Sequence, residues 1–294
     1  MIFYFRYPIV LLCILLSVVN ADHSRSQEQA MMQPISKAEL EAAVKMRVVF
    51  AHKSVGYNVL EGVRKLAAEQ GIALNVIETR KPPAEGAGIF HFTIGQNGAP
   101  DKKISEYAST LGAVNFPDVD IALLKLCYLD FGADTDALAL AKSYTDVLEQ
   151  LQKVHPKTRF VAVTAPLTTV QTGPKAWVKG LLGRSTGYSE NARRNEFNEY
   201  LRQQFGHGRL FDIAKIESEE GGASQDEPPA LQAEITNDGG HLNDRGQRLI
   251  GAAFLKLLAS PQNNGANVRA GLKSSAAPDL PESKFENFTA VNRN

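Results

Sequence analysis

Residues 46–58 have the sequence MRVVFAHKSVGYN, in which a short β-branched and apolar run is followed closely by Ser54. The apolar run at 46–51 predicts a buried strand, and apolar side chains at helical spacing over 58–70 predict a helix directly after it. Gly71 marks the end of that helix, as glycine commonly does at a C-cap. Ser54 is therefore expected at a turn from a strand into a helix.

The same alternation of strand-like and helix-like segments continues along the chain. Further strands are expected at 72–77, 119–126, 160–165 and 210–213, and further helices at 101–111, 138–154, 191–205 and 249–258. The stretch 81–100 is rich in Gly and Pro and is expected to be a long loop. This pattern predicts an α/β fold, a three-layer α/β/α sandwich with a central parallel sheet of about five strands, flavodoxin-like in architecture.

The two ends of the chain differ in composition from this middle part. Residues 1–21 combine a basic residue, an unbroken apolar stretch and small residues at the end, which predicts a secretory signal peptide cleaved near Ala21, with an uncleaved anchor as the alternative. Residues 22–44 are polar and are expected to form a linker or a loose N-terminal helix. Residues 260–294 have few apolar side chains and are expected to be disordered. A single folded domain is then expected at 45–259, in a secreted or periplasmic protein without a stable membrane span.

Charge and cysteine content exclude several classes of protein. Lys plus Arg and Asp plus Glu number 32 each, so the neutral chain gives no support for binding nucleic acid or an anionic membrane. The pairs Lys102-Lys103 and Arg193-Arg194 are expected on solvated helix faces. Removal of the signal peptide would leave Cys127 as the only cysteine, which indicates a buried small side chain and no internal disulfide. Nothing in the composition indicates an oligomeric state.

A second informative segment stands just before the last expected helix. Residues 237–243 have the sequence NDGGHLN, which contains Asp238 and His241. A serine nucleophile needs an imidazole to take its proton, and the imidazole needs a carboxylate to hold its tautomer. In open α/β sheets ligands bind beyond the carboxyl ends of the strands, where Ser54, Asp238 and His241 can converge. The simpler alternatives are that Ser54 only caps a helix and that Asp238 to His241 only form a turn.

In this order along the chain, the motifs resemble those of the SGNH hydrolase superfamily, the GDSL-type esterases and lipases, over about residues 48–258. The resemblance implies an ester hydrolase without a cofactor. It implies that Ser54 is the nucleophile, His241 the general base and Asp238 the carboxylate that orients it. It also implies an oxyanion hole formed by the backbone amides of Ser54 and Gly98.

Two departures from the family pattern affect the expected site. The family's Gly-Asp-Ser corresponds to His52-Lys53-Ser54, and the family's third-block asparagine corresponds to Leu129, which cannot donate a hydrogen bond. Asn97 is the nearest replacement donor in the sequence.

Several other side chains are expected near the site or at the surface. His52, His91 and Tyr128 are expected to contact substrate, and no spacing around the two histidines resembles a metal site, so no metal is expected. Asp130 is expected to be structural, bonding backbone amides at the end of a strand. Asn191, Arg194 and Asn198 share one helix face, which is expected to be solvated. The segment 167–189, which holds Trp177, is either a lid over the site or a surface loop.

The sequence therefore predicts an exported serine hydrolase that cleaves an acyl or acetyl ester, on a carbohydrate or another small molecule, through an acyl-enzyme. Two alternatives stay open. An acyltransferase would use the same site and pass the acyl group to a sugar hydroxyl. A non-catalytic protein that binds a carbohydrate or other ligand would use the same scaffold, and Leu129 is the residue that favours it. A nucleotide-binding flavodoxin-like protein is disfavoured because the segment after the first strand is poor in glycine.

Overall fold

The computed structural model describes residues 34–171, 173–174, 181, 185–206, 208–219 and 229–261. The expected signal peptide, Trp177 and nearly all of the expected C-terminal tail lie outside these residues. Within the described part, none of the helices is long and apolar enough to cross a membrane.

The sheet has six strands, which all pair in parallel. They are β1 (Arg47–His52), β2 (Val76–Glu78), β3 (Gly88–Thr93), β4 (Ile121–Leu124), β5 (Arg159–Val163) and β6 (Leu210–Phe211). Their order across the sheet is β2-β3-β1-β4-β5-β6. Without the short edge strand β2, this is the order of flavodoxin-like doubly wound sheets. The predicted α/β fold is confirmed, with one strand more than the expected number.

The additional strand is β3, which lies inside the stretch 81–100 that the sequence analysis predicts to be a loop. That prediction is wrong for Gly88–Thr93, where five of the six residues are buried between neighbouring strands. Gly and Pro flank this strand and do not interrupt it, so they mark the connections on either side. The strand expected at 72–77 is reduced to β2, whose residues are largely exposed at the edge of the sheet.

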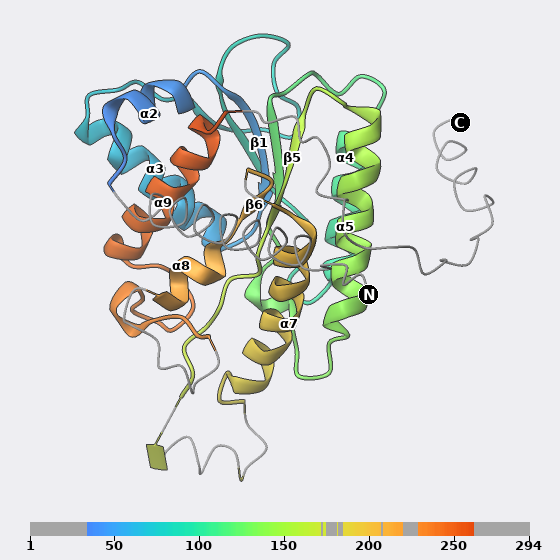
Figure 1. The fold of residues 1–294 in the computed structure, drawn as a ribbon, viewed down its shortest axis with the longest axis vertical. Helices are drawn as coiled ribbons and strands as arrows, with labels where there is room; N and C mark the ends of the chain where they lie inside the picture. Colours follow the sequence, from blue (N-terminus) through green and yellow to red (C-terminus); the bar gives the residue numbers. More distant parts are fainter. Residues whose placement is uncertain are drawn as a thin grey trace, which may run out of the picture. The chain divides into compact units, whose positions relative to one another are not determined.

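Helices cover both faces of the sheet. They are α2 (Lys37–Ala43), α3 (Val55–Glu69), α4 (Pro100–Leu111), α5 (Ala137–Val154), α7 (Tyr188–Gln204), α8 (Ile213–Glu219) and α9 (Asp244–Ala259). Helices α2, α3, α8 and α9 lie on one side of the strands, and α4, α5 and α7 lie on the other (Figure 1). The three expected layers are therefore present.

Successive side chains of β1 point alternately into the two apolar cores on either side of the sheet. Val48 and Phe50 pack with the α3 and α9 side, whereas Val49 and Ala51 pack with the α4 and α5 side. A central strand that is buried on both faces has no polar alternation, which is why its sequence is a continuous apolar run.

Helices α3 and α9 pack against each other through glycine. A Cβ atom on Gly62 of α3 would lie 1.8 Å from the carbonyl oxygen of Gln247 in α9. Ser54 immediately precedes α3, and His241 lies three residues before α9. The close packing of these two helices therefore brings segments from opposite ends of the chain together.

Candidate active site

Ser54 occupies a strained turn between β1 and α3. Its backbone has φ 48° and ψ −105°, and it is the one residue other than glycine with positive φ in the described part of the chain. A residue held in such a conformation costs on the order of 1–3 kcal/mol, and such strain is concentrated at functional sites. The side chain makes no capping hydrogen bond to α3, so the helix-cap alternative does not account for this serine.

The segment that contains His241 is folded back on itself by Thr236. The Thr236 hydroxyl donates to the carbonyl oxygen of His241 at 2.6 Å and accepts from the backbone N–H of Gly239 at 3.0 Å. Residues Thr236 and Leu242 form an isolated antiparallel bridge across the loop. These contacts fix the backbone on both sides of the imidazole.

Asp238 is held by backbone amides of the same loop. Its Oδ1 atom accepts hydrogen bonds from the N–H groups of Gly240 at 2.9 Å and His241 at 2.7 Å. The backbone hydrogen bond from His241 is the main reason why the pKa of Asp238 lies well below its ordinary value, and the bonds from the His241 ring and from Gly240 act in the same direction. The carboxylate is therefore ionised at neutral pH.

Ser54, His241 and Asp238 form one hydrogen-bonded chain. The Ser54 Oγ lies 2.5 Å from Nε2 of His241, and Nδ1 of His241 lies 2.7 Å from Oδ2 of Asp238. The His241 and Asp238 side chains are 45% and 56% exposed, so the chain lies at an open surface. The structure thus brings together the three residues that the sequence analysis groups.

One predicted oxyanion donor, the backbone amide of Gly98, already has an acceptor within the protein. The N–H of Gly98, which is predicted to be an oxyanion donor, donates to Oδ1 of Asp130 at 2.9 Å in this structure. The side-chain oxygen of Asn97 accepts from Nζ of Lys103 at 3.0 Å. The sequence could not show this, because the acceptor Asp130 follows a different strand.

Lys103 is buried and forms an ion pair with Asp130, which contradicts the expected solvated position. Both side chains are 0% exposed, and the lysine Nζ lies 2.8 and 2.7 Å from the two carboxylate oxygens. Asp130 also accepts from the N–H of Cys127 at 2.7 Å, as expected for a structural carboxylate. The burial of both charges is tolerated because each is paired and hydrogen-bonded. The pair joins the first turn of α4 to the segment after β4.

His52 and His91 lie inside the protein and do not form the expected substrate surface. His52 is 0% and His91 3% exposed, and Nε2 of the first lies 3.2 Å from Nδ1 of the second. Burial is the main reason why the pKa of His52 falls to about 2, and burial also lowers the pKa of His91. Both rings are therefore neutral at physiological pH. Among the residues that the structure describes, no group of three His, Cys, Asp or Glu side chains is placed to hold a metal ion.

Of the residues predicted to contact substrate, Tyr128 lies beside the hydrogen-bonded chain of Ser54, His241 and Asp238. Its ring centroid lies 5.8 Å from that of His241, with the rings inclined at 75°. Burial raises the pKa of Tyr128, and a side-chain hydrogen bond with Ser54 acts in the opposite direction. The phenol is therefore protonated at neutral pH and next to the serine.

The polar face of α7 turns toward the protein, which contradicts the expectation that it is solvated. Asn191, Arg194 and Asn198 are 0%, 3% and 0% exposed. Arg194 donates from Nε to the carbonyl oxygen of Tyr128 at 3.1 Å and from Nη1 to the hydroxyl of Thr168 at 2.9 Å. Burial lowers the pKa of Arg194 to about 10. The shared face was visible in the spacing, but its partners were not, because they follow β4 and β5.

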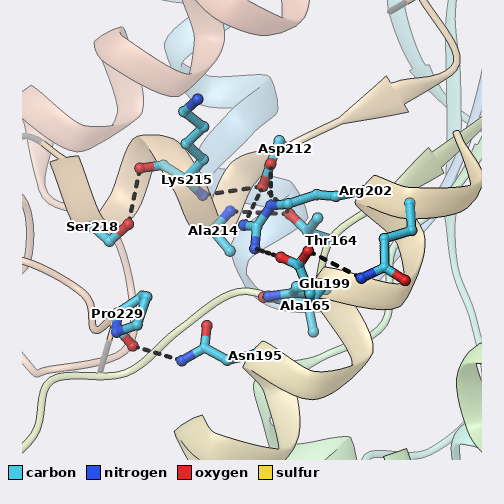
Figure 2. Close-up of polar contacts among 12 residues, drawn as sticks. Thr164, Ala165, Asn195, Glu199, Arg202, Asp212, Ala214, Lys215, Ser218 and Pro229 are labelled. Atoms are coloured by element: carbon cyan, nitrogen blue, oxygen red, sulfur yellow. Dashed lines mark hydrogen bonds and ion pairs between the residues drawn. The ribbon is translucent and has the colours of Figure 1, made fainter. Parts of the chain in front are cut away.

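Helix α7 is anchored at Arg202 to the residues after β5 and β6, and at Asn195 to a connecting segment. Arg202 donates to both carboxylate oxygens of Asp212, at 2.7 and 2.9 Å, and Asp212 also accepts from the Thr164 hydroxyl at 3.2 Å (Figure 2). Asn195 donates to the carbonyl oxygen of Pro229 at 2.9 Å, as Figure 2 also shows. These contacts fix the helix that carries Arg194.

Comparison with known proteins gives structural neighbours only. No protein-family model matches the chain, and no curated protein matches it. Similar solved structures include a Streptococcus pneumonia protein named for platelet activating factor, with TM-score 0.45 and 13% identity over 81% of this chain and 99% of the other. A carbohydrate acetylesterase from Sinorhizobium meliloti has TM-score 0.40 and 13% identity over 72% and 98%. A member of the lipolytic G-D-S-L family from Veillonella parvula has TM-score 0.40 and 14% identity over 71% and 95%.

Proposed function

We propose that this protein is a serine hydrolase of ester bonds, with Ser54 as nucleophile, His241 as general base and Asp238 as the carboxylate that orients the imidazole. The observation that supports this proposal is the continuous hydrogen-bonded chain from Ser54 Oγ through the two imidazole nitrogens to Asp238. The strained backbone of Ser54 supports it independently.

In the proposed mechanism the proton moves from Ser54 to His241, and the hydrogen-bond geometry supports this direction. Because ionised Asp238 can only accept at Nδ1 of His241, Nδ1 carries the hydrogen and Nε2 presents a lone pair to Ser54. As Oγ forms its bond to the carbonyl carbon of the ester, its proton moves to Nε2. His241 then returns this proton to the departing alcohol, and an acyl group remains on Ser54. Water, deprotonated by the same imidazole, attacks the acyl group and releases the acid.

The substrate that we propose is an acyl or acetyl ester of a carbohydrate or another small molecule. The exposure of His241 and Asp238 supports an alcohol portion that extends into solvent, as a sugar would. The N-terminal sequence pattern supports export, so we place the substrate in the periplasm or outside the cell. Transfer of the acyl group to a sugar hydroxyl in place of water would use the same site.

The test is covalent labelling with a fluorescent fluorophosphonate, which reacts with activated serines. We expect the wild-type protein to be labelled and the Ser54→Ala and His241→Ala variants to remain unlabelled. Ser109→Ala is the matched control, because Ser109 is exposed on α4 and bonds only its own helix. Absence of labelling in the folded wild-type protein would contradict catalysis and favour the non-catalytic binding protein.

A further inference from the structure

Ester hydrolysis places negative charge on the substrate carbonyl oxygen, which must be stabilised by hydrogen-bond donors. Two backbone donors between β3 and α4, one of them the predicted donor Gly98, are already bonded in this structure. The N–H of Gly98 bonds Asp130, and the N–H of Gly95 bonds Oε2 of Glu106 at 2.9 Å. Leu129 is 54% exposed but has no donor in its side chain. With Gly98 bonded elsewhere, a further donor beside Ser54 would add to the stabilisation that the serine's own amide gives.

Tyr128 carries a hydroxyl close to Ser54 and His241. Its ring meets the His241 ring edge to face, and a Cβ atom added to Gly240 would lie only 3.1 Å from the phenolic oxygen. The phenolic oxygen therefore lies against the residue that precedes His241, whose Nε2 is bonded to Ser54. The absence of a side chain at Gly240 leaves the space that the phenol occupies.

The position of Tyr128 is fixed from behind by Arg194. The guanidinium lies 5.8 Å from the centre of the phenol ring and also donates to the backbone carbonyl of Tyr128 at 3.1 Å. Arg194 is buried and makes further bonds to Thr168 and Asn191, so it does not move freely. A donor that is held in place before the reaction stabilises developing charge without reorganisation.

From this geometry we infer that Tyr128 is a further catalytic residue, whose hydroxyl donates a hydrogen bond to the charge that develops on the reacting oxygen beside Ser54. The inference rests on the proposed serine hydrolase function. The phenol keeps its O–H bond throughout, and no proton is transferred from it. The electron pair of the carbonyl bond moves to the substrate oxygen as the bond to Oγ forms, and returns when the alcohol leaves.

The experiment compares wild type, Tyr128→Phe and the control Tyr188→Phe, which removes a hydroxyl from an exposed tyrosine at the start of α7. The readouts are the rate constant of fluorophosphonate labelling and kcat and KM for p-nitrophenyl acetate. Loss of one such donor costs about 10²–10³-fold in kcat in other acyl-transfer enzymes, and we expect Tyr128→Phe to fall in this range with KM little changed. Labelling of Tyr128→Phe should be slower but should reach completion.

The phenylalanine variant separates a role of the hydroxyl from a role of the ring. The ring contact with His241 is retained in Tyr128→Phe, so the midpoint of thermal unfolding and the shape of the pH–rate profile should match those of wild type. If wild type is labelled at Ser54 and Tyr128→Phe keeps kcat within about threefold, the role of Tyr128 is wrong while the serine mechanism stands. If wild type is not labelled at all, both the mechanism and the role of Tyr128 are overturned.

Discussion

Gly62 of α3 and Gly251 of α9 lie in direct backbone contact: a Cβ atom on Gly251 would be 2.7 Å from the carbonyl carbon of Gly62. The two helices begin beside Ser54 and His241, the residues whose side chains form a hydrogen bond. The helix contact therefore sets the separation of two reactive groups that are 187 positions apart in the sequence.

Gly62→Ala should destabilise the protein and weaken the site together. The added Cβ would lie 1.8 Å from the carbonyl oxygen of Gln247, so the helices must move apart, at a cost of about 1–3 kcal/mol or more. Chemical denaturation measures the loss, and fluorophosphonate labelling at a temperature where the variant is folded measures the effect on Ser54. Gly206→Ala is the control, because a Cβ there would meet nothing within 4 Å. Equal stability of the two variants would contradict the close packing of the helices.

Asp238→Asn should reduce kcat by about 10⁴-fold, since the amide can donate to Nδ1 and would favour the wrong imidazole tautomer. Steady-state kinetics with p-nitrophenyl acetate at neutral pH checks this expectation. The matched control is Asp101→Asn, a change at an exposed residue in the first turn of α4, which should leave kcat unchanged. Retention of wild-type kcat in Asp238→Asn would show that the carboxylate does not orient His241.

Lys103→Ala should destabilise the protein by about 3–5 kcal/mol, because it leaves the buried charge of Asp130 without its partner. Urea denaturation measures the change in the free energy of unfolding. Lys102→Ala, at the exposed neighbour on the same helix, should change it by less than about 0.5 kcal/mol. A small change in the free energy of unfolding of Lys103→Ala would mean that water solvates the carboxylate of Asp130 in place of the lysine.

Glu217 should make the protein less stable as the pH rises. Its side chain is completely buried, and burial raises its pKa from 4.5 to about 8, against the attraction of Lys125 and Arg194. Because the folded state holds this proton to a higher pH than the unfolded state does, stability falls between about pH 4.5 and pH 8.

Glu217→Gln should remove this contribution to the pH dependence. The variant keeps an oxygen that can accept from the N–H of Leu167, a bond of 2.6 Å in the wild type. The melting temperature of the variant minus that of wild type should therefore increase from pH 5 to pH 8. Scanning calorimetry measures both temperatures. A constant difference in melting temperature across this range would contradict the raised pKa.

The sequence allowed the α/β fold and the grouping of Ser54, Asp238 and His241 to be predicted, because both depend on local patterns and on chain order. The apolar run before Ser54 defines a central strand, and carboxyl ends of parallel strands meet at one edge of the sheet. Strand β3 was missed because its six residues stand among glycines and prolines, and their burial comes from β1 and β2 on either side.

Side chains whose role depends on distant partners could not be predicted from the sequence. Lys103 and Arg194 look like surface cations in a local reading, yet each is buried by a partner that follows another strand. The same holds for Gly98, whose amide is bonded by Asp130, and for His52, which is covered by residues of other elements. Tertiary contacts, not local pattern, decide the burial of these polar groups.

The most direct test of the proposed mechanism is to identify the residue that the fluorophosphonate labels. The wild-type protein is treated with fluorophosphonate, digested and analysed by mass spectrometry, beside the His241→Ala variant. We expect a stoichiometric adduct on Ser54 in the wild type and none in His241→Ala. An adduct on another serine, or equal labelling of Ser54 in both proteins, would contradict the claim that His241 activates Ser54.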